Sequence, residues 1–94
     1  MELKESFGPT VRAIRLGKKL PQAALDLNQG YLSELENGTK MPTIPKMVAI
    51  ADGLGIHPIT LLTAVYEAMG PAGAAELMKR VERELKTLKA ENLN

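Results

Sequence analysis

The sequence contains no cysteine and only one histidine, His57. Without cysteine, the chain can form neither a disulfide framework nor a thiolate metal site. His57 precedes Pro58 at an apparent turn with no second metal ligand or nucleophile nearby, so it is interpreted as a helix-entry residue. Paired carboxylates, a Ser-His-Asp set and a phosphate-cradling glycine loop are also missing. These absences predict a protein that is not an enzyme and that uses no metal, cofactor or small-molecule ligand.

Long apolar runs are missing too. The longest fall far short of the ~20 residues needed to span a membrane, and the acidic start Met-Glu-Leu-Lys-Glu is unlike a signal peptide. The sequence therefore predicts a soluble, cytoplasmic protein with no membrane partner. Neither charge is in large excess, because the formal net charge is +1 over 94 residues. The strongly basic balance that often marks nucleic-acid-binding domains is thus absent.

Residues 28–38 have the pattern of a helix with one apolar and one polar face. Asn28 suits the N-cap, because its short side chain can accept a hydrogen bond from a backbone N–H of the first turn. Gly38 suits the left-handed position just beyond a helix C-terminus. The apolar stripe consists of Tyr31, Leu32 and Leu35. The polar face carries hydrogen-bonding groups and one small residue, namely Gln29, Gly30, Ser33 and Glu34. This pattern predicts a recognition helix.

A first helix is expected to begin with Ser6 as its cap and to run to about Lys19, with Pro9 in its first turn. The side chains expected to face inward are those of Phe7, Val11, Ile14 and Leu20. A short apolar segment, residues 21–27, leads from this helix into the recognition helix.

Two further apolar helices are predicted after Gly38. Thr43 caps the first, which ends at Gly55, and the second follows Ile56-His57-Pro58 and runs to about Met69. The first has the spacing of a well-buried helix, with apolar residues at Ile44, Met47, Val48, Ile50, Ala51 and Leu54. The sequence therefore predicts an all-α fold in which residues 1–69 form a compact five-helix head.

Gly70-Pro71-Ala72-Gly73 is the clearest helix breaker and separates the head from residues 70–94. A helix to about Asn92 is then predicted, with a heptad seam of apolar residues spaced 4, 3, 4 and 3 apart, at Ala74, Met78, Val81, Leu85 and Leu88. Met78 and Leu85 occupy heptad position a, and Val81 and Leu88 occupy position d. Position e holds Glu82 and Lys89, and position g holds Leu77, Glu84 and Glu91. Met78, Val81, Leu85 and Leu88 are predicted to hold a homodimer together. The alternative is that this short helix packs back on its own head.

The order of these residues resembles the lambda-repressor-like (Xre/Cro-type) helix-turn-helix family over about residues 7–62. The matching runs are Phe7-Gly8-x-x-Val11-Arg12-x-x-Arg15, Leu20-Pro21-Gln22-x-x-Leu25, Asn28-x-x-Tyr31-Leu32-Ser33-x-Leu35-Glu36-Asn37-Gly38, Pro42-Thr43-Ile44, Ile50-Ala51-x-x-Leu54-Gly55-Ile56 and Leu61-Leu62. The Glu-Asn-Gly-x-x-x-Pro run, joined to Ile-Ala-x-x-Leu-Gly-Ile at the expected distance, makes the combination specific.

The resemblance implies a helix-turn-helix whose recognition helix enters the major groove of DNA. By similarity, base contacts are expected from Asn28, Gln29, Gly30, Ser33 and Glu34, and phosphate contacts from Gln22, Asn37 and Lys40. Gln29 can bond an adenine at two points, and Glu34 can accept from a cytosine amino group. Arg15 and Glu36 match a partly buried ion pair of the family and are expected to be structural.

One segment departs from the family pattern. Between Gln22 and Tyr31 the family has about four more residues, close to one helical turn of 3.6. Here Leu25-Asp26-Leu27-Asn28 runs straight into the recognition helix, and Pro21 replaces the usual Ser/Thr-type cap. The second helix is therefore expected to be shortened, with compensation from the other helices and a dimer partner, or with a remodelled or destabilised head.

Together, these features predict sequence-specific binding of double-stranded DNA, at a palindromic operator, by a homodimeric transcriptional regulator that acts as a repressor. The alternative is an antitoxin-like or adaptor protein whose helix after residue 74 binds another chain. A gel shift distinguishes these two hypotheses, because only the homodimeric regulator is expected to bind palindromic DNA with no partner protein present.

Overall fold

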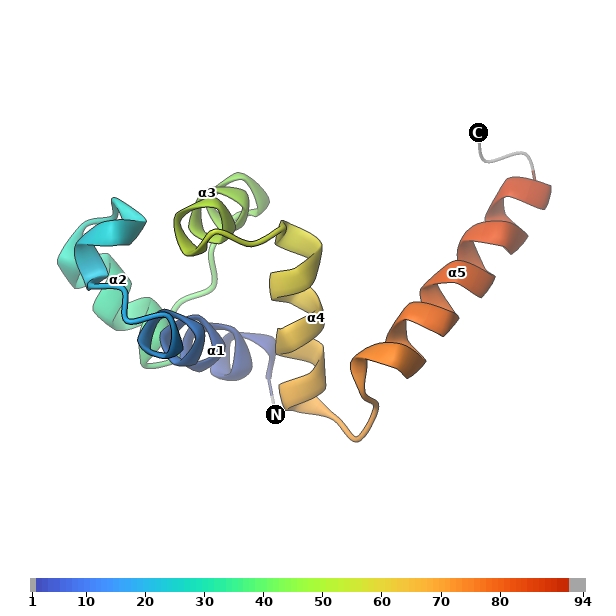
Figure 1. The fold of residues 1–94 in the computed structure, drawn as a ribbon, viewed down its shortest axis with the longest axis horizontal. Coiled ribbons are helices and arrows are strands. Elements are labelled where there is room, and N and C mark those ends of the chain that lie inside the picture. Colours follow the sequence, from blue (N-terminus) through green and yellow to red (C-terminus); the bar gives the residue numbers. More distant parts are fainter. Residues whose placement is uncertain (1, 92–94) are drawn as a thin grey trace.

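The computed structural model describes residues 2–91, and these fold into five α-helices and one short 3-10 helix with no strand among them. In chain order, the elements are α1 (Leu3–Gly17), η1 (Gln22–Leu25), α2 (Gln29–Glu36), α3 (Ile44–Leu54), α4 (Pro58–Met69) and α5 (Ala74–Ala90). The first five form a head, and α5 extends away from it as a single helix (Figure 1). The predicted all-α class is confirmed. The predicted helix end at Asn92 lies outside the described residues.

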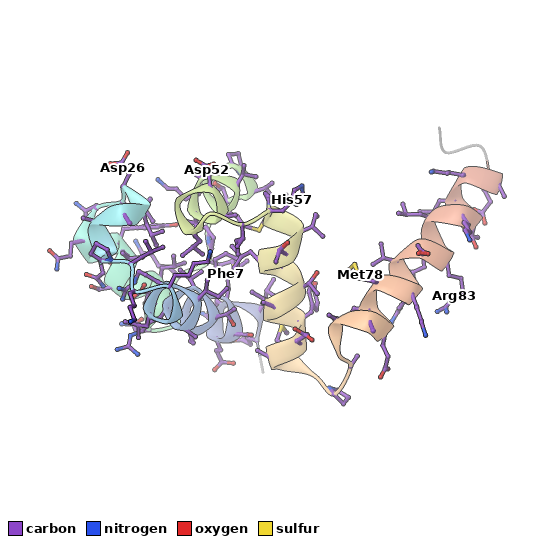
Figure 2. The ribbon with its side chains drawn as sticks, in the orientation of Figure 1. Phe7, Asp26, Asp52, His57, Met78 and Arg83 are labelled. Atoms are coloured by element: carbon purple, nitrogen blue, oxygen red, sulfur yellow. The ribbon has the colours of Figure 1, made fainter. Side chains whose placement is uncertain are left out.

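Apolar side chains from every element of the head form its core. Phe7, the only phenylalanine of the chain, is fully buried in the middle of the head (Figure 2). The other core residues are Val11, Leu25, Leu32, Leu35, Met47, Ile50, Ala51, Leu54, Leu61 and Val65. Burial of one large apolar side chain contributes ~1.5–3 kcal/mol. A core of this size therefore holds α1, α2, α3 and α4 in fixed positions.

The start of α1 differs from the prediction that Ser6 caps it. The helix begins at Leu3, and Glu5 accepts a hydrogen bond from the backbone N–H of Glu2 at 2.7 Å. Ser6 is instead buried in α1, where its hydroxyl donates to the carbonyl oxygen of Val65 on α4 at 3.0 Å. Pro9 consequently lies in the second turn of α1 rather than in the first. The Ser6 side chain is therefore a contact between α1 and α4 and not a helix cap.

The predicted caps of the later helices are confirmed. The side chains of Asn28 and Thr43 accept hydrogen bonds from the backbone N–H three residues later, at 3.2 and 3.3 Å. Nδ1 of His57 accepts from the backbone N–H two residues later at 3.0 Å, so the histidine is a helix-entry residue. Gly38 (φ +88°) and Gly55 (φ +74°) adopt the left-handed conformation that ends α2 and α3.

Two residues of α3 are exposed where the sequence predicted a well-buried helix. Ile44 and Val48 are 73% and 45% exposed. Ile44 is the first residue of α3 and lies beyond the edge of the core. Val48 lies beside the stripe that actually faces inward, which is formed by Met47, Ile50, Ala51 and Leu54. The prediction for Ile44 and Val48 was therefore wrong.

The shortened second helix is a single turn of 3-10 helix, η1, and it is anchored to α3. Its Leu25 is 3% exposed. A Cβ atom on Gly53 of α3 would lie 3.0 Å from Leu25 Cδ2 and 3.2 Å from the carbonyl oxygen of Ala24. The glycine thus lets η1 pack closely on α3. One buried leucine and one close backbone contact replace the packing of a longer helix.

After Met69 the chain turns through residues 70–73 into α5. The backbone N–H of Ala74 donates to Glu67 Oε2 at 2.7 Å, which ties the start of α5 to the end of α4. From this point α5 diverges from α4, so that the two helices form a wedge (Figure 1). Among residues 2–91, no single helix is long and apolar enough to cross a membrane, although α3 and α4 together reach that length and composition with a bend of 97° between them.

Candidate nucleic-acid interface

Helix α2 has one side fixed in the head and the other open to solvent. Leu32 and Leu35 are fully buried and Glu36 is 6% exposed. The residues predicted to contact bases are all exposed and lie at the N-cap and on the first two turns of α2, namely Asn28, Gln29, Gly30, Ser33 and Glu34. The structure therefore gathers them on one open surface, here called the α2 face. Asn28 has the additional task of capping α2.

A buried ion pair fixes the C-terminal end of α2 to α1. Arg15 Nε donates to Glu36 Oε2 at 2.8 Å, Arg15 Nη2 donates to Oε1 at 3.1 Å, and Nη1 donates to the carbonyl oxygen of Leu20 at 2.9 Å. The two side chains are only 8% and 5% exposed. Hydrogen bonding to the Glu36 carboxylate raises the pKa of Arg15, against the opposing effect of burial. The guanidinium therefore stays charged and holds α2 in a defined orientation.

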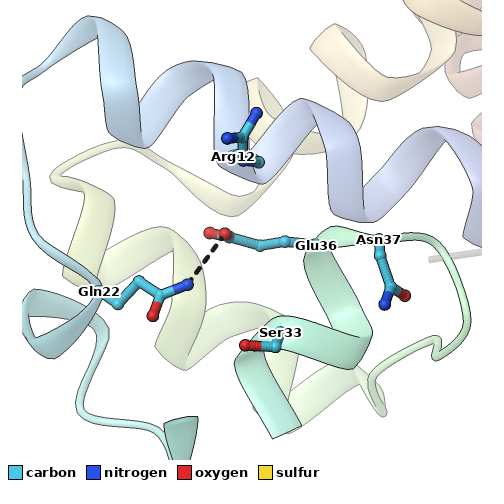
Figure 3. Close-up of a pocket in the computed structure, with 5 residues that line it drawn as sticks. All are labelled: Arg12, Gln22, Ser33, Glu36 and Asn37. Carbon is cyan, nitrogen blue, oxygen red and sulfur yellow. Dashed lines mark hydrogen bonds between the residues drawn. The ribbon is translucent and has the colours of Figure 1, made fainter. Parts of the chain in front are cut away.

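A chain of side-chain hydrogen bonds connects this ion pair to the α2 face. Gln22 Nε2, at the start of η1, donates to Glu36 Oε1 at 3.3 Å (Figure 3). Gln29 Nε2, at the start of α2, donates to Gln22 Oε1 at 3.4 Å. The starts of the two helices thus meet despite the shortened segment between them. Gln22 and Gln29 are positioned by a network that ends at Arg15.

A pocket of about 380 Å³ opens beside α2, lined by Arg12, Gln22, Ser33, Glu36 and Asn37 (Figure 3). Two of these, Gln22 and Asn37, were predicted to contact phosphates. Arg12 was not predicted, and it adds a cation to the same surface. In the sequence, Arg12 belongs to the run of residues 7–15 that resembles the family, and it precedes Arg15 by three residues, which places the two side chains on neighbouring parts of α1.

Asn37 ends α2 and is held by the loop that follows. Its Oδ1 accepts hydrogen bonds from the backbone N–H of Thr39 at 3.2 Å and from the Thr39 hydroxyl at 2.9 Å. A carboxamide has its acceptor on the oxygen and its two donor hydrogens on the nitrogen. Because the oxygen is engaged, the amino group is the part of Asn37 suited to a phosphate.

Two lysines lie over the ring of Tyr31 at the edge of the α2 face. Lys40 Nζ is 5.4 Å and Lys46 Nζ is 5.3 Å from the ring centroid. Lys40 Nζ is also 3.8 Å from Glu34 Oε1, between side chains that are both about half exposed. Lys46 was not among the predicted site residues. It enters the site because the packing of the head brings the first turn of α3 next to Tyr31.

Comparison with known proteins identifies the family. Residues 11–61 match the family model HTH_3, described as Helix-turn-helix. The chain belongs to this helix-turn-helix family. It is 30% identical over 71 residues to an uncharacterized HTH-type transcriptional regulator of Sinorhizobium fredii, across 71% of this chain and 92% of the relative. It is 38% identical over 61 residues to Control protein C.BamHI of Bacillus amyloliquefaciens, across 60% of this chain and 75% of the relative.

Solved structures agree with this HTH_3 assignment. A crystal structure of the clp gene regulator ClgR from Corynebacterium glutamicum has 27% identity and a TM-score of 0.69, over 74% of this chain and 96% of that chain. A second ClgR crystal structure, with 24% identity and a TM-score of 0.68, extends the fold match to 97% of this chain and 95% of that chain. The predicted lambda-repressor-like resemblance is confirmed. The HTH_3 family to which this chain belongs is one of DNA-binding transcriptional regulators.

Proposed function

We propose that this HTH_3 protein binds specific sequences of double-stranded DNA as a homodimer and represses transcription from the promoters that it occupies. Residues 1–69 would form the DNA-binding domain, and residues 70–94 the dimerisation element. The observation that carries the proposal is the exposed polar face of α2, held on a rigid support by the Arg15–Glu36 ion pair. A reading helix needs this combination, because base recognition depends on side chains held in a fixed position.

Sequence is read by the α2 face. Gln29 offers the donor and acceptor that an adenine edge requires, and Glu34 offers the acceptor that a cytosine amino group requires. Gly30 lets the backbone come close to the groove, and Ser33 adds a small hydroxyl. Asn28 contributes from the N-cap. In free protein, Gln29 is bonded to Gln22, so the Gln29 side chain is already oriented before DNA binds.

Phosphate contacts surround this reading surface on two sides. Gln22, Asn37 and Arg12 line the pocket between α1 and α2. Lys40 and Lys46 flank Tyr31 at the other edge. Contacts of this kind set the position of the protein on the duplex without reading sequence. They also account for DNA binding by a chain with a net charge of only +1, because the cations are placed locally.

A homodimer is proposed because two heads must act together. Half-sites read by such dimers lie about one turn of DNA apart, ~34 Å between centres. The apolar seam of α5 is left exposed by its own head, which favours a role between subunits over packing within one subunit. Repression then requires only that the bound dimer occupies a promoter. Action on chromosomal or plasmid DNA would place the protein in the cytoplasm.

The test is selection of bound duplexes from a random DNA library by the pure protein, followed by a gel shift. The expected result is one enriched site with two-fold symmetry and half-sites centred about 10–10.5 base pairs apart. A promoter that overlaps the selected site should then give less transcript when the protein is added. Absence of any enriched sequence would overturn the proposal. A DNA shift that needs a second protein would favour the antitoxin-like or adaptor alternative.

A further inference from the structure

The wedge between α4 and α5 is lined by apolar side chains that the head leaves uncovered. No residue of α5 is buried among residues 74–90. The large apolar side chains of this region are each between 39% and 54% exposed, and they are Ile59, Tyr66, Met78, Val81, Leu85 and Leu88. Contiguous apolar surface of this kind marks an interaction site.

Four of these side chains line one groove, and Leu85 and Leu88 lie further along the same seam of α5. The groove has a volume of about 500 Å³ and lies between the helices. It is lined by Ile59, Leu62, Thr63 and Tyr66 on α4 and by Leu77, Met78, Arg80, Val81 and Glu84 on α5. Figure 2 shows Met78 on the side of α5 that faces α4, and Arg83 on the opposite side. Met78 and Val81 of the α5 seam therefore face the groove, which Arg80 and Glu84 also line.

We infer that α5 of a second copy of this chain fills the groove and that the two α5 helices run parallel and in register. This arrangement rests on the proposed homodimer and adds its geometry. In a parallel pair, the residue at heptad position g faces position e of the next heptad on the other helix. Glu84 then faces Lys89 of the partner subunit. The two-fold axis creates this opposite-charge contact twice.

The antiparallel pair is disfavoured by the same charges. Full overlap of the seam in an antiparallel pair places Met78 opposite the partner's Leu88, and Val81 opposite the partner's Leu85. The flanking positions e and g then face their own copies, so Glu82 lies near the partner's Glu82 and Glu84 near the partner's Glu84. Like charges at these positions oppose pairing. Charge pattern and apolar seam are therefore both satisfied only in the parallel arrangement.

Glu84 is already engaged within α5, and this engagement is compatible with the pairing. Glu84 Oε2 accepts a hydrogen bond from Arg80 Nε at 3.2 Å, and both side chains are more than half exposed. A carboxylate has about four acceptor positions on its two oxygens. Arg80 thus orients the Glu84 side chain and leaves acceptor capacity for Lys89 of the partner subunit.

Disulfide cross-linking tests the orientation directly, because the chain has no cysteine of its own. In a parallel pair, the two copies of Leu88→Cys lie side by side, and mild oxidation should give a covalent dimer. In the antiparallel pair, they would be ~15 Å apart along the helix axis, at 1.5 Å per residue. A mixture of Met78→Cys and Leu88→Cys proteins should form only the two homodimers. A mixed 78–88 disulfide would overturn the parallel arrangement.

Charge reversal tests the Glu84 contact independently. Lys89→Glu should weaken the dimer about tenfold in sedimentation equilibrium without DNA, and Glu84→Lys added to it should restore affinity. The control is Lys86→Glu, which makes the same charge change at position b, away from the seam, and should leave the dimer unchanged. Equal effects of Lys86→Glu and Lys89→Glu would contradict the contact. A wild-type chain that stays monomeric at micromolar concentration would overturn the homodimer itself, whereas a mixed disulfide would overturn only its orientation.

Discussion

Arg15 and Glu36 lie 21 residues apart in the sequence and form a bidentate ion pair, with 2.8 Å between Nε and Oε2 and 3.1 Å between Nη2 and Oε1. The pair joins the last turn of α1 to the end of α2. Through Gln22, the same carboxylate is also linked to Gln29 on the α2 face. A structural contact in the head thus supports the side chain proposed to read DNA.

Loss of this ion pair should destabilise the head strongly. Glu36→Ala leaves the Arg15 guanidinium buried without its carboxylate, and we expect the free energy of unfolding to fall by ~3–5 kcal/mol. Urea unfolding followed by circular dichroism measures the change. The control is Glu34→Ala, which removes an exposed pair with Lys40 and should cost no more than ~1 kcal/mol. Similar losses for the two variants would contradict the structural role of Glu36.

Gly8 lies where α1 packs closely against α2, so that its replacement should also destabilise the head. A Cβ atom on Gly8 would lie 1.5 Å from the carbonyl oxygen of Leu35, a backbone atom that cannot move without shifting α2. Gly8→Ala should therefore lower the free energy of unfolding by at least ~1–3 kcal/mol. Gly17→Ala, at the last residue of the same helix and with nothing within 4 Å, should raise it by ~0.4–1 kcal/mol, because alanine reduces the entropy of the unfolded chain. Thermal unfolding that moves in the same direction for both variants would be inconsistent with this packing.

Local sequence signals predicted most of the helix ends. Asn28, Thr43, Gly38 and Gly55 act on the backbone within a few residues, so their roles follow from residue type and position. The role of Ser6 could not be predicted in this way. Its hydroxyl bonds Val65, which is 59 residues away, and that contact depends on how α1 and α4 pack.

For the candidate site, too, the sequence predicted the residues whose position follows from local helix periodicity and not those placed by tertiary packing. Gln29 and Ser33 could be assigned to an exposed face, because the period of α2 separates them from Leu32 and Leu35. Arg12 and Lys46 lie on other helices, and their position beside α2 is set by tertiary packing. Residue type alone marked them as surface charges. Only the arrangement of α1 and α3 around α2 brings them to the candidate interface.

The shortened second helix should be the least protected part of the head in hydrogen exchange. Around η1, the backbone N–H of Ala24 donates to the carbonyl oxygen of Pro21 and that of Asp26 donates to the carbonyl oxygen of Ala23, and Leu25 is the buried anchor. Exchange through local opening should therefore be faster for amides of residues 21–27 than for those of residues 44–54. Mass spectrometry or NMR gives both rates in one sample. Equal protection of the two segments would show that η1 is as firmly held as α3.

The lysines beside Tyr31 should act on DNA affinity without acting on sequence preference. Lys40→Ala and Lys46→Ala should each weaken binding to selected and random duplexes alike, because phosphates are common to all sequences. Each should also reduce the slope of log affinity against log salt by about 0.9. Lys79→Ala on α5 removes an exposed lysine away from the α2 face and serves as the control. An unchanged slope for Lys46→Ala would remove Lys46 from the interface.

Sequence reading by α2 is tested most directly by the affinities of wild-type protein and Gln29→Ala for two duplexes, the selected site and random DNA, at one salt concentration. Gln29 is exposed, so its replacement leaves the apolar side of α2 intact. The expected result is a loss of ~1–3 kcal/mol on the selected site, relaxed preference at one base position and almost no loss on random DNA. Equal losses on both duplexes would contradict base recognition by Gln29.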